Sequence, residues 1–356
     1  MTDNRDNPLP AVLAIDGGNS KTDVALVGGD GALLAAVRGP GSNAHILGLD
    51  QAMAVLAELA RAAAVQAGLA GPGAGHPPLA AHVSACLAGA DLARDEERLG
   101  AALRAQGWAP TCTVVNDTFA ILRAGLVPGL AGAGRGGADG DGALRHWGVG
   151  VTCGAGINCV ALAPDGREAR FPALGEVTGD WGGGGGLGRE ALWWAVRDED
   201  GRGPQTMLRA AVAAHFGLPT ASDVGIGIHY GTVDDARLLG LAPVLLQIAG
   251  QGDEVARDLV IRQADEIVAM AVAMIRRLDL ADSAVPVILG GGLLTARDPL
   301  LTDAIAARLA ARVPAASLHI VDVPAVAGAA LLGLDHVGAP VHAEERLRAA
   351  YLSQRA

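Results

Sequence analysis

One unit of sequence occurs twice in this chain and constrains its fold more than any other feature. In the first copy, a strand at residues 11–15 is followed by a glycine turn at residues 16–21 and a second strand at residues 22–27. A Gly-Gly-Asp-Gly turn at residues 28–31 then leads into a third strand at residues 32–38. Apolar runs bounded by glycine turns predict strands joined as hairpins.

The same order of strands and turns returns after residue 146. Strands are predicted at residues 147–151 and 158–163, with a glycine turn at residues 152–156 between them, and a Pro-Asp-Gly hairpin turn follows. Because the unit occurs twice at a long interval, we interpret it as one duplication and not as a solenoid repeat.

The two copies align when Asp16 is placed on Thr152, a shift of 136. With this shift, Val24 falls on Val160, and the second hairpin turn arrives one residue early. Between and after the two copies, strand-like segments alternate with helix-like ones, for example a helix at residues 49–66, which favours an α/β architecture. The Gly/Ala-rich stretch at residues 126–145 is predicted to be a loop or linker.

The composition excludes several classes of function. The net charge is −11, and Lys and Arg are spread along the chain, so a nucleic-acid or anionic-membrane surface is not expected. The first ten residues do not resemble a signal peptide, and no run of about 18 apolar residues predicts a membrane span, so the cytoplasm is the expected compartment. Four cysteines show no zinc-type spacing, and Cys86 and Cys112 are expected to be buried thiols.

The first glycine turn has the residues that a phosphate and its metal require. Gly17 and Gly18 let the backbone approach an anion closely, and Ser20 adds a hydroxyl donor, while Asn19 and Lys21 complete the candidate nucleotide-binding turn. Mg²⁺ prefers one or two carboxylates together with phosphate oxygens, which makes the preceding Asp16 the candidate metal residue. The competing interpretation is a hairpin with a solvated aspartate.

Two further glycine segments are candidates for the same ligand. Gly154, Ala155 and Gly156 repeat the turn in the second copy, and the spacing does not match a dinucleotide fingerprint. Two facing turns would hold a triphosphate between them. A third segment, Gly290-Gly291-Gly292, lies between an apolar strand and a helix expected near Asp298, where it could pack against an adenine ring. The alternative for this segment is a plain strand-to-helix turn.

Asn116 and Asp117 lie between a short strand at residues 113–115 and a helix beginning near Thr118. A carboxylate there, close to the positive end of a helix, could accept the proton of a sugar hydroxyl during phosphoryl transfer. The competing role for Asp117 is that of a helix N-cap.

A run of five glycines at residues 182–186 follows Gly-Asp-Trp and precedes a helix expected at about residues 187–196. We predict a flexible loop over a site, with Glu176, Asp180 and Trp181 offering acceptors and an apolar face to a sugar. The alternative is a surface linker.

These motifs in this order resemble the N-acetylglucosamine kinase family, within the BadF/BadG/BcrA/BcrD-type ATPases of the sugar kinase and actin superfamily. The resemblance covers residues 12–337 and implies a duplicated actin-like (ribonuclease H-like) ATPase fold with a cleft between two domains, at residues 1–116 and 117–325. A helix near residues 326–337 would pack back on the first domain. Beyond the strings already given, it uses Gly-Ser-Asn at 41–43, Ala-Gly-Ala-Asp at 88–91 and Gly-Ala-Ala-Leu-Leu-Gly at 328–333.

The resemblance also implies roles for individual residues. Asp117 would be the base for the sugar 6-hydroxyl, and Asp16 and Ser20 would serve Mg²⁺ and ATP. A homodimer is expected. The substrate-binding candidates are Asn43, Asp91, Asn116, Asn158, Glu176 and Asp180.

The preferred sugar and the reaction class leave alternatives. Ala155 and Ile157 replace hydroxyl residues of the family's second turn, and Leu174 stands where animal members have Trp. N-acetylglucosamine is the expected substrate of an ATP-dependent kinase reaction, and glucosamine and N-acetylmuramic acid are the alternatives. A different class is an ATPase activator of a dehydratase, which would bridge an iron–sulfur cluster through Cys, and a sugar-sensing regulator is a third.

Overall fold

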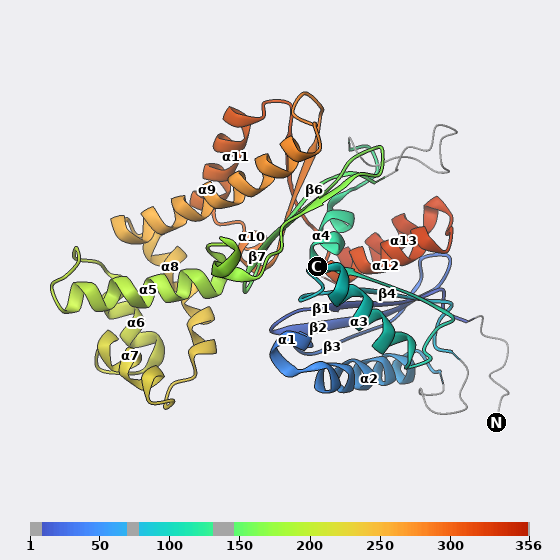
Figure 1. Ribbon diagram of the computed structural model, residues 1–356, viewed down its shortest axis with the longest axis horizontal. Coiled ribbons are helices and arrows are strands. Elements are labelled where there is room, and N and C mark those ends of the chain that lie inside the picture. Colours follow the sequence, from blue (N-terminus) through green and yellow to red (C-terminus); the bar gives the residue numbers. More distant parts are fainter. Residues whose placement is uncertain (1–8, 70–77, 131–145, 355–356) are drawn as a thin grey trace.

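The computed structural model describes residues 9–69, 78–130 and 146–354. It consists of two halves, each built on one mixed β-sheet, with α4, α12 and α13 close to the place where the halves meet (Figure 1). This arrangement confirms the predicted α/β fold.

The first sheet has the strand order β3-β2-β1-β4-β5. The chain runs back and forth through the first three strands, which pair antiparallel, and β4 and β5 then add parallel to β1. Its strands are β1 (Val12–Gly17), β2 (Lys21–Val27), β3 (Leu33–Pro40), β4 (His82–Leu87) and β5 (Thr111–Asn116).

The second sheet repeats this topology. Its order is β10-β9-β6-β7-β8, with β6, β7 and β8 antiparallel in sequence and with β9 and β10 parallel to β6. Read from the other edge, this is the pairing pattern of the first sheet, so the duplication is confirmed. The strands are β6 (Gly148–Cys153), β7 (Ile157–Leu162), β8 (Glu168–Arg170), β9 (Pro286–Gly290) and β10 (Ser317–Ile320).

The strand register corrects one detail of the predicted alignment. Val24 pairs with Ile15, and the equivalent partner of Val151 is Cys159, so Val24 corresponds to Cys159 and not to Val160. The reason is a shorter glycine turn: the last paired residues enclose residues 18–21 in the first hairpin, where Gly17 pairs with Thr22, and only residues 154–156 in the second, where Cys153 pairs with Ile157. The offset of one residue therefore arises at the glycine turn and persists to the hairpin turn.

Helices cover one face of the first sheet with a continuous apolar layer. In α2 (Leu49–Gln66), the buried side chains recur every three or four residues, as expected for one helix face packed on a sheet. They join Leu13 and Ile15 of β1 in a common core. The other described helices on this half before α4 are α1 (Ala44–Leu47) and α3 (Ala93–Arg104).

The second half has a larger helical layer around a core of its own. The long helix α9 (Glu254–Arg277) contacts β6 and β7, and α11 (Pro299–Arg312) packs on α9. The remaining helices of this half are α5 (Gly183–Glu199), α6 (Leu208–Phe216), α7 (Ala221–His229), α8 (Leu241–Gly250), α10 (Gly292–Thr295) and the 3-10 helices η1 (Gly175–Thr178) and η2 (Asp235–Gly240).

Two helices cross between the sheets and join the halves. The first, α4 (Asp117–Gly125), contacts β6 and β9, while α12 (Ala325–His336) packs on β1 and β4, and the two helices pack on each other. Gly328 permits this close approach, because a Cβ there would lie 1.9 Å from the carbonyl oxygen of Ala120. The last helix, α13 (Val341–Ser353), joins the same central core. The domain boundary at residues 116/117 stays a prediction.

The glycine run at residues 182–186 is not a loop, which corrects the prediction. Gly183 begins α5, and the helix reaches Glu199 instead of covering only residues 187–196. Helix N-termini leave backbone N–H groups without partners inside the helix. Here Gly183 donates to Oε1 of Gln263 at 2.8 Å, and the next two N–H groups donate to carbonyl oxygens of the second glycine turn. The glycines therefore bring a helix end onto the turn.

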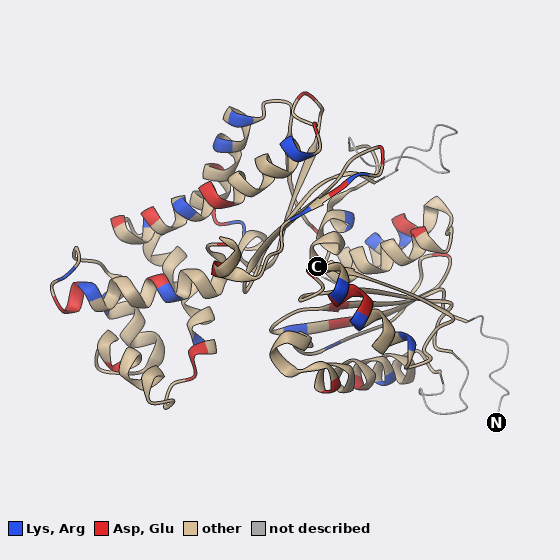
Figure 2. Ribbon diagram, viewed as in Figure 1, with Lys and Arg blue, Asp and Glu red and all other residues tan. Residues whose placement is uncertain are grey.

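Other predictions have mixed outcomes. Cys86 is buried as expected, but Cys112 on the edge strand β5 is partly exposed. Residues 131–145 of the predicted Gly/Ala-rich loop lie outside the described residues, and the described part after α4 contains turn residues. Among the described helices, none is both long enough and apolar enough for a membrane crossing. Acidic and basic residues are interspersed over both halves (Figure 2).

Candidate active site

A cleft of about 1080 Å³ lies between the two sheets and is lined by residues from both halves. It brings together most of the residues that the sequence singled out. Those on its wall are Asp16, Gly18, Asn19, Ser20, Lys21, Asn43, Asp91, Asn116, Asp117, Gly154, Ala155, Gly156, Asn158, Gly291 and Gly292.

Four predicted site residues lie elsewhere. Gly17 ends β1 and is buried, with Leu87 and Ser42 where its side chain would be. Gly290 ends β9 against Ile121 in the same way. Gly17 and Gly290 therefore lie behind the residues that line the cleft and do not line it themselves. Glu176 and Asp180 line a second cavity of about 410 Å³.

Three carboxylates face the first cleft close enough to affect one another. Burial raises the pKa of Asp16 to about 8, and the neighbouring charges of Asp117 and Asp23 add to that effect. Burial likewise raises the pKa of Asp91 to about 7, with a further contribution from Asp117. The main cause of the raised pKa values is burial, and for Asp16 and Asp91 the neighbouring carboxylates add to it. Such a site suits a cation or a proton-accepting role.

Asp117 is the first residue of α4, and the structure separates it from the capping role. The N-cap is Asn116, whose Oδ1 accepts the N–H of Thr118 at 2.9 Å. Burial raises the pKa of Asp117 to about 6, while backbone N–H groups at the helix start act in the opposite direction. Its carboxylate therefore lines the cleft and has a pKa close to neutral, which suits a general base.

An amide network joins the two halves beside Asp117. Nδ2 of Asn116 donates to Oδ1 of Asp91 at 2.8 Å, and Nδ2 of Asn158 donates to Oδ1 of Asn116 at 3.2 Å. Asn158 comes from β7 of the second half, so this network crosses the cleft floor. Amide and carboxylate groups held in this way offer donors and acceptors to the hydroxyls of a sugar.

Asn43 extends the polar wall toward the first glycine turn. It is the N-cap of the short helix α1, with Oδ1 accepting the N–H of His45 at 2.8 Å. Its Nδ2 donates to Oδ1 of Asn19 at 2.7 Å. The segment after β3 is thus tied to the turn after β1.

The two glycine turns are closed and supported in the same manner. In the first, Gly18 donates to the carbonyl oxygen of Lys21, and in the second Gly154 donates to that of Gly156, both at 2.9 Å. Each turn is also bound from behind by a backbone N–H. Ser42 donates to Gly18 at 3.1 Å, and Gly184 donates to Gly154 at 2.7 Å.

These bonds leave N–H groups available at the tips of both turns. Within the described residues, the N–H groups of Asn19, Ser20, Ala155 and Gly156 make no backbone hydrogen bond. Successive N–H groups of this kind form concave anion sites. Both turn tips line the cleft, so an anion could be bound from two sides.

The end of the cleft near β9 is apolar. Gly291 has a φ of 91°, which suits glycine, and a Cβ there would meet the backbone of Cys153 at 2.4 Å. Here the structure adds the short helix α10 before the expected helix, which begins at Pro299 with Asp298 as its N-cap. Apolar residues of α8 and α10 line this end, among them Leu246 and Leu293. A flat aromatic ring such as a purine fits such a wall.

Asp180 and Glu176 sit around η1. Oδ2 of Asp180 accepts from Oγ1 of Thr178 at 2.6 Å and from the N–H of Gly175 at 3.1 Å. Glu176 is exposed and contacts Arg189 at 3.4 Å. Their cavity shares lining residues of the second glycine turn with the main cleft, so the two spaces adjoin.

Several residues of the cleft were not predicted as site residues from the sequence. Arg38 of β3 forms an ion pair with Asp23 of β2, with Nε at 2.6 Å from Oδ1, and both line the cleft. Asp16, Asp23 and Arg38 are cross-strand partners and therefore lie on one sheet face, which the register of β1, β2 and β3 shows and a sequence motif does not. Thr152 lines the cleft opposite the first turn, and its alignment with Asp16 had marked it.

The donor set is compatible with Mg²⁺ brought in by a nucleotide. Within residues 9–69, 78–130 and 146–354, no group of three His, Cys, Asp or Glu side chains could hold a metal ion by itself. Mg²⁺ in phosphate-transferring sites needs only one or two carboxylates, because phosphate oxygens and water supply the remaining ligands. Asp16, with its raised pKa and its place beside the turn, fits that requirement.

The chain is similar to known proteins over most of its length. The BadF/BadG/BcrA/BcrD ATPase family model matches residues 13–333. An N-acetylmuramic acid/N-acetylglucosamine kinase of Clostridium acetobutylicum is 26% identical, over 80% of this chain and 85% of its own length. An N-acetyl-D-glucosamine kinase of Dictyostelium discoideum is 24% identical, over 91% and 97%.

A solved structure from Chromobacterium violaceum, assigned to an N-acetylglucosamine kinase, shares the fold. It superposes with a TM-score of 0.67 at 24% identity and covers 92% of this chain and 99% of its own. The duplicated actin-like architecture predicted from the sequence is thus confirmed.

Proposed function

Since this chain belongs to the BadF/BadG/BcrA/BcrD ATPase family, we propose that it is an ATP-dependent kinase that phosphorylates the 6-hydroxyl of an amino sugar. The observation that carries the proposal is the meeting of Asp117, the amide network and two anion-binding turns in one cleft. The similarity to curated relatives that act on N-acetylated amino sugars makes N-acetylglucosamine the first candidate acceptor.

Each part of the cleft has a role in this reaction. The turn tips at residues 18–20 and 154–156 would bind the phosphates through backbone N–H groups, and Asp16 would hold Mg²⁺, which neutralises phosphate charge when bound. The segment at residues 290–292 would flank the adenosine. The first half thus carries the charged contacts to the nucleotide.

The sugar would lie at the other end, against Asp91, Asn116, Asn158 and Asn43, with Asp180 and Glu176 reaching it from the second cavity. Asp117 would accept the proton of the attacking hydroxyl while the bond between that oxygen and phosphorus forms and the bond to ADP breaks. A base with a raised pKa is ionised above about pH 6 and still returns the proton readily.

An electron-transferring ATPase activator of the same family receives less support. Such a protein needs accessible thiolates for its cluster, and Cys86, Cys153 and Cys159 are buried. Burial raises the pKa of the Cys153 thiol to about 12. The remaining cysteine, Cys112, lies on an edge strand away from the cleft.

The test is a coupled measurement of ADP release with Mg²⁺ and ATP over N-acetylglucosamine, N-acetylmuramic acid, glucosamine and glucose. We expect release that depends on an N-acetylated sugar, and phosphorus NMR should place the phosphate on the 6-oxygen. ADP release that no amino sugar increases would contradict the proposal.

We also propose that the protein is a cytoplasmic homodimer. Light scattering of the purified protein measures its molar mass and so tests the dimer.

A further inference from the structure

The last helix contributes one residue to the cleft that no part of the proposed reaction has used. Tyr351 of α13 lines the cleft although its side chain is only 5% exposed. Its ring packs in the central core beside Leu347. Within the described structure, its hydroxyl has no hydrogen-bond partner. Buried hydroxyls normally have one, so this group needs an explanation.

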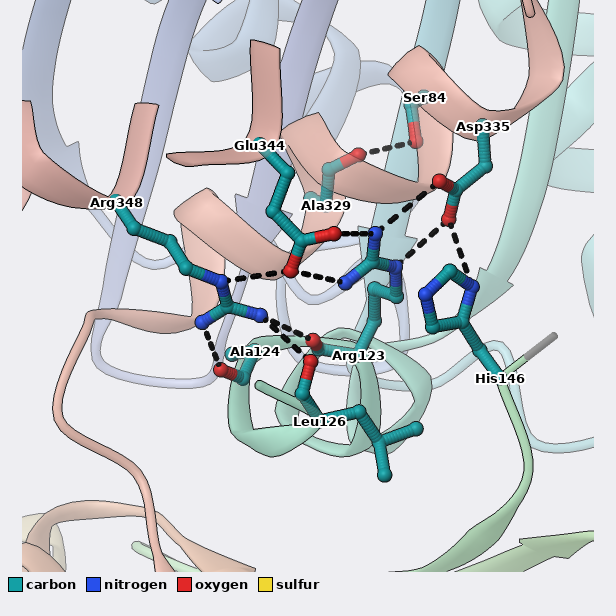
Figure 3. A network of polar contacts seen from close by, with 9 residues as sticks. All are labelled: Ser84, Arg123, Ala124, Leu126, His146, Ala329, Asp335, Glu344 and Arg348. Carbon is teal, nitrogen blue, oxygen red and sulfur yellow. Dashed lines mark hydrogen bonds and ion pairs between the residues drawn. The ribbon is translucent and has the colours of Figure 1, made fainter. Parts of the chain in front are cut away.

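The position of Tyr351 is set by strong contacts one turn earlier in α13. Arg348 donates to the carbonyl oxygens of Ala124 at 2.6 Å and Leu126 at 2.9 Å, at the C-terminal end of α4 (Figure 3). Glu344 of α13 binds the buried Arg123 of α4, with 2.8 Å between Oε2 and Nη2. These contacts tie α13 to the helix that begins with Asp117.

The start of α13 is fixed to the first sheet. Arg346 pairs with Asp30 in the turn between β2 and β3. In the same turn, a Cβ on Gly31 would overlap the carbonyl of Ala343, so helix and turn are in direct backbone contact. Since a helix advances about 1.5 Å per residue, Tyr351 lies roughly 12 Å further along than Ala343. Bound at three places, α13 holds the phenol in one position.

Tyr351 shares the cleft wall with two acidic residues of the first sheet. Asp16 and Asp23 line the same cleft as Tyr351. Burial raises the pKa of Tyr351, and the carboxylates of Asp23 and Asp16 raise it further, so the hydroxyl remains a proton donor at neutral pH. Asp23 is already paired with Arg38, and no hydrogen bond joins either carboxylate to Tyr351 in the described structure.

We propose that the hydroxyl of Tyr351 hydrogen-bonds the hydrated metal–triphosphate group of bound Mg·ATP, so that the C-terminal helix completes the nucleotide site. The proposal rests on the use of ATP in the proposed function. The partner could be a phosphate oxygen or a metal-bound water, which share the chemistry of a strongly polarised oxygen. Tyr351 would thus contact the nucleotide directly and would take no part in the proton transfer assigned to Asp117.

The experiment compares Tyr351→Phe with Tyr230→Phe. Tyr230 is the other tyrosine of the chain, is 75% exposed and does not line the cleft. Calorimetry with a non-hydrolysable ATP analogue, with Mg²⁺ and with EDTA, measures affinity without any turnover. Thermal unfolding of the ligand-free proteins measures whether the hydroxyl has a structural role.

We expect Tyr351→Phe to unfold at the same temperature as the parent or slightly higher, because no hydrogen bond is lost. Its affinity for the analogue with Mg²⁺ should fall roughly tenfold, as the loss of a hydrogen bond to a charged group would cause, while Tyr230→Phe binds normally. A deficit that persists in EDTA assigns the bond to a phosphate oxygen, and one that disappears assigns it to a metal-bound water.

Unchanged affinity of Tyr351→Phe in the presence of Mg²⁺ overturns the inference. A lower unfolding temperature with normal affinity also overturns it and makes the hydroxyl a structural group. If the parent protein itself does not bind the analogue, the proposed function fails. The two failures are therefore distinguishable.

Discussion

The two glycine turns have the same place in the two sheets and different chemistry. The turn after β1 follows Asp16 and contains a hydroxyl and an ammonium group, at Ser20 and Lys21. The turn after β6 follows Thr152, is one residue shorter and has no ionisable side chain at residues 154–156. The first copy therefore carries charged groups at its turn, and the second offers backbone donors.

The two helices that cross between the sheets, α4 and α12, also differ in charge, and again the first half carries the acidic residue. In the first half, β5 ends at Asn116, which caps α4 and places Asp117 at its start. In the second half, β10 leads to α12, which follows Pro324 and has no acidic residue in its first turn. The repeated fold thus provides two equivalent frames, and the first frame together with α4 supplies the acidic residues that line the cleft.

The largest expected effect concerns Asp117, which has no acidic counterpart in the second half. Asp117→Asn should keep the fold and nucleotide binding while lowering kcat by roughly 10²-fold or more, because the base is lost. For the parent, kcat/KM should fall below about pH 6, where the carboxyl of the free enzyme becomes protonated.

Asp298→Asn is the matched control, since Asp298 caps α11 outside the cleft and Asn caps equally well. It should leave kcat unchanged. Sugar-dependent turnover of Asp117→Asn within a few-fold of the parent would remove Asp117 from the role of base.

The next effect compares the residues that precede the two turns. Asp16→Asn should raise the Mg²⁺ concentration needed for half-maximal rate by roughly tenfold, because one carboxylate ligand of the metal is lost. Thr152→Val changes the aligned residue and should alter this value by less than about threefold, since threonine is not a preferred Mg²⁺ ligand. Titration of Mg²⁺ at fixed ATP measures both. Equal shifts would show that the halves share the metal.

A smaller effect tests the segments behind the turns. A Cβ at Gly183 would lie 2.6 Å from the backbone of Gly156, and one at Gly41 would lie 2.1 Å from the carbonyl oxygen of Asn19. Either Gly→Ala change should displace its turn and raise KM for ATP several-fold.

The control for these changes is in the same helix. Gly186 has open space around it within α5, so Gly186→Ala should stabilise the helix by up to about 1 kcal/mol and leave KM unchanged. A normal KM for Gly183→Ala, measured on folded protein, would show that the second turn does not contact the nucleotide.

The smallest effect is on stability. Asp16, Asp91 and Asp117 have pKa values of about 8, 7 and 6 in the folded protein, above those of unfolded carboxyls, so the native state binds more protons. The stability of the ligand-free protein should therefore decrease as pH rises from about 5 to 8. We expect the melting temperature to fall by roughly 2 °C or more, because a loss of about 1 kcal/mol in the free energy of unfolding has this effect in a large domain.

Asp16→Asn should flatten this pH dependence, and Mg²⁺ should stabilise the parent more at pH 8 than at pH 5. Scanning fluorimetry across this range measures both. If the melting temperature rises with pH equally in the parent and in Asp16→Asn, the carboxyls of the cleft do not have raised pKa values.

Much of the fold could be predicted because its signals are local. The helix at residues 49–66 is found with the predicted bounds, since its apolar residues recur with the helical period. The two hairpin units could also be predicted from local signals, because their apolar strands are bounded by glycine turns. The residue equivalence of β2 and β7 was not, because a turn shortened by one residue leaves the pattern of each strand intact.

In the candidate site, too, residues with a local sequence signal could be predicted, and residues placed by tertiary contacts could not. Asp16, Asp117 and the glycine turns stand at the ends of strands, where sequence patterns are informative. Arg38 and Tyr351 reach the cleft only through sheet pairing and through packing of the last helix, and neither has a motif. The glycine run at residues 182–186 was misassigned, because low helix propensity was overruled by tertiary contacts with Gln263 and the second turn.

The position of α13 has a practical consequence for handling the protein. Gln354, just after this helix, lines the cleft together with Tyr351. A fluorescent label attached at Gln354→Cys would therefore lie at the cleft wall, and its emission would report what enters the cleft without any turnover. The partly exposed Cys112 would be changed to Ser first, so that the label has one accessible target among the described cysteines.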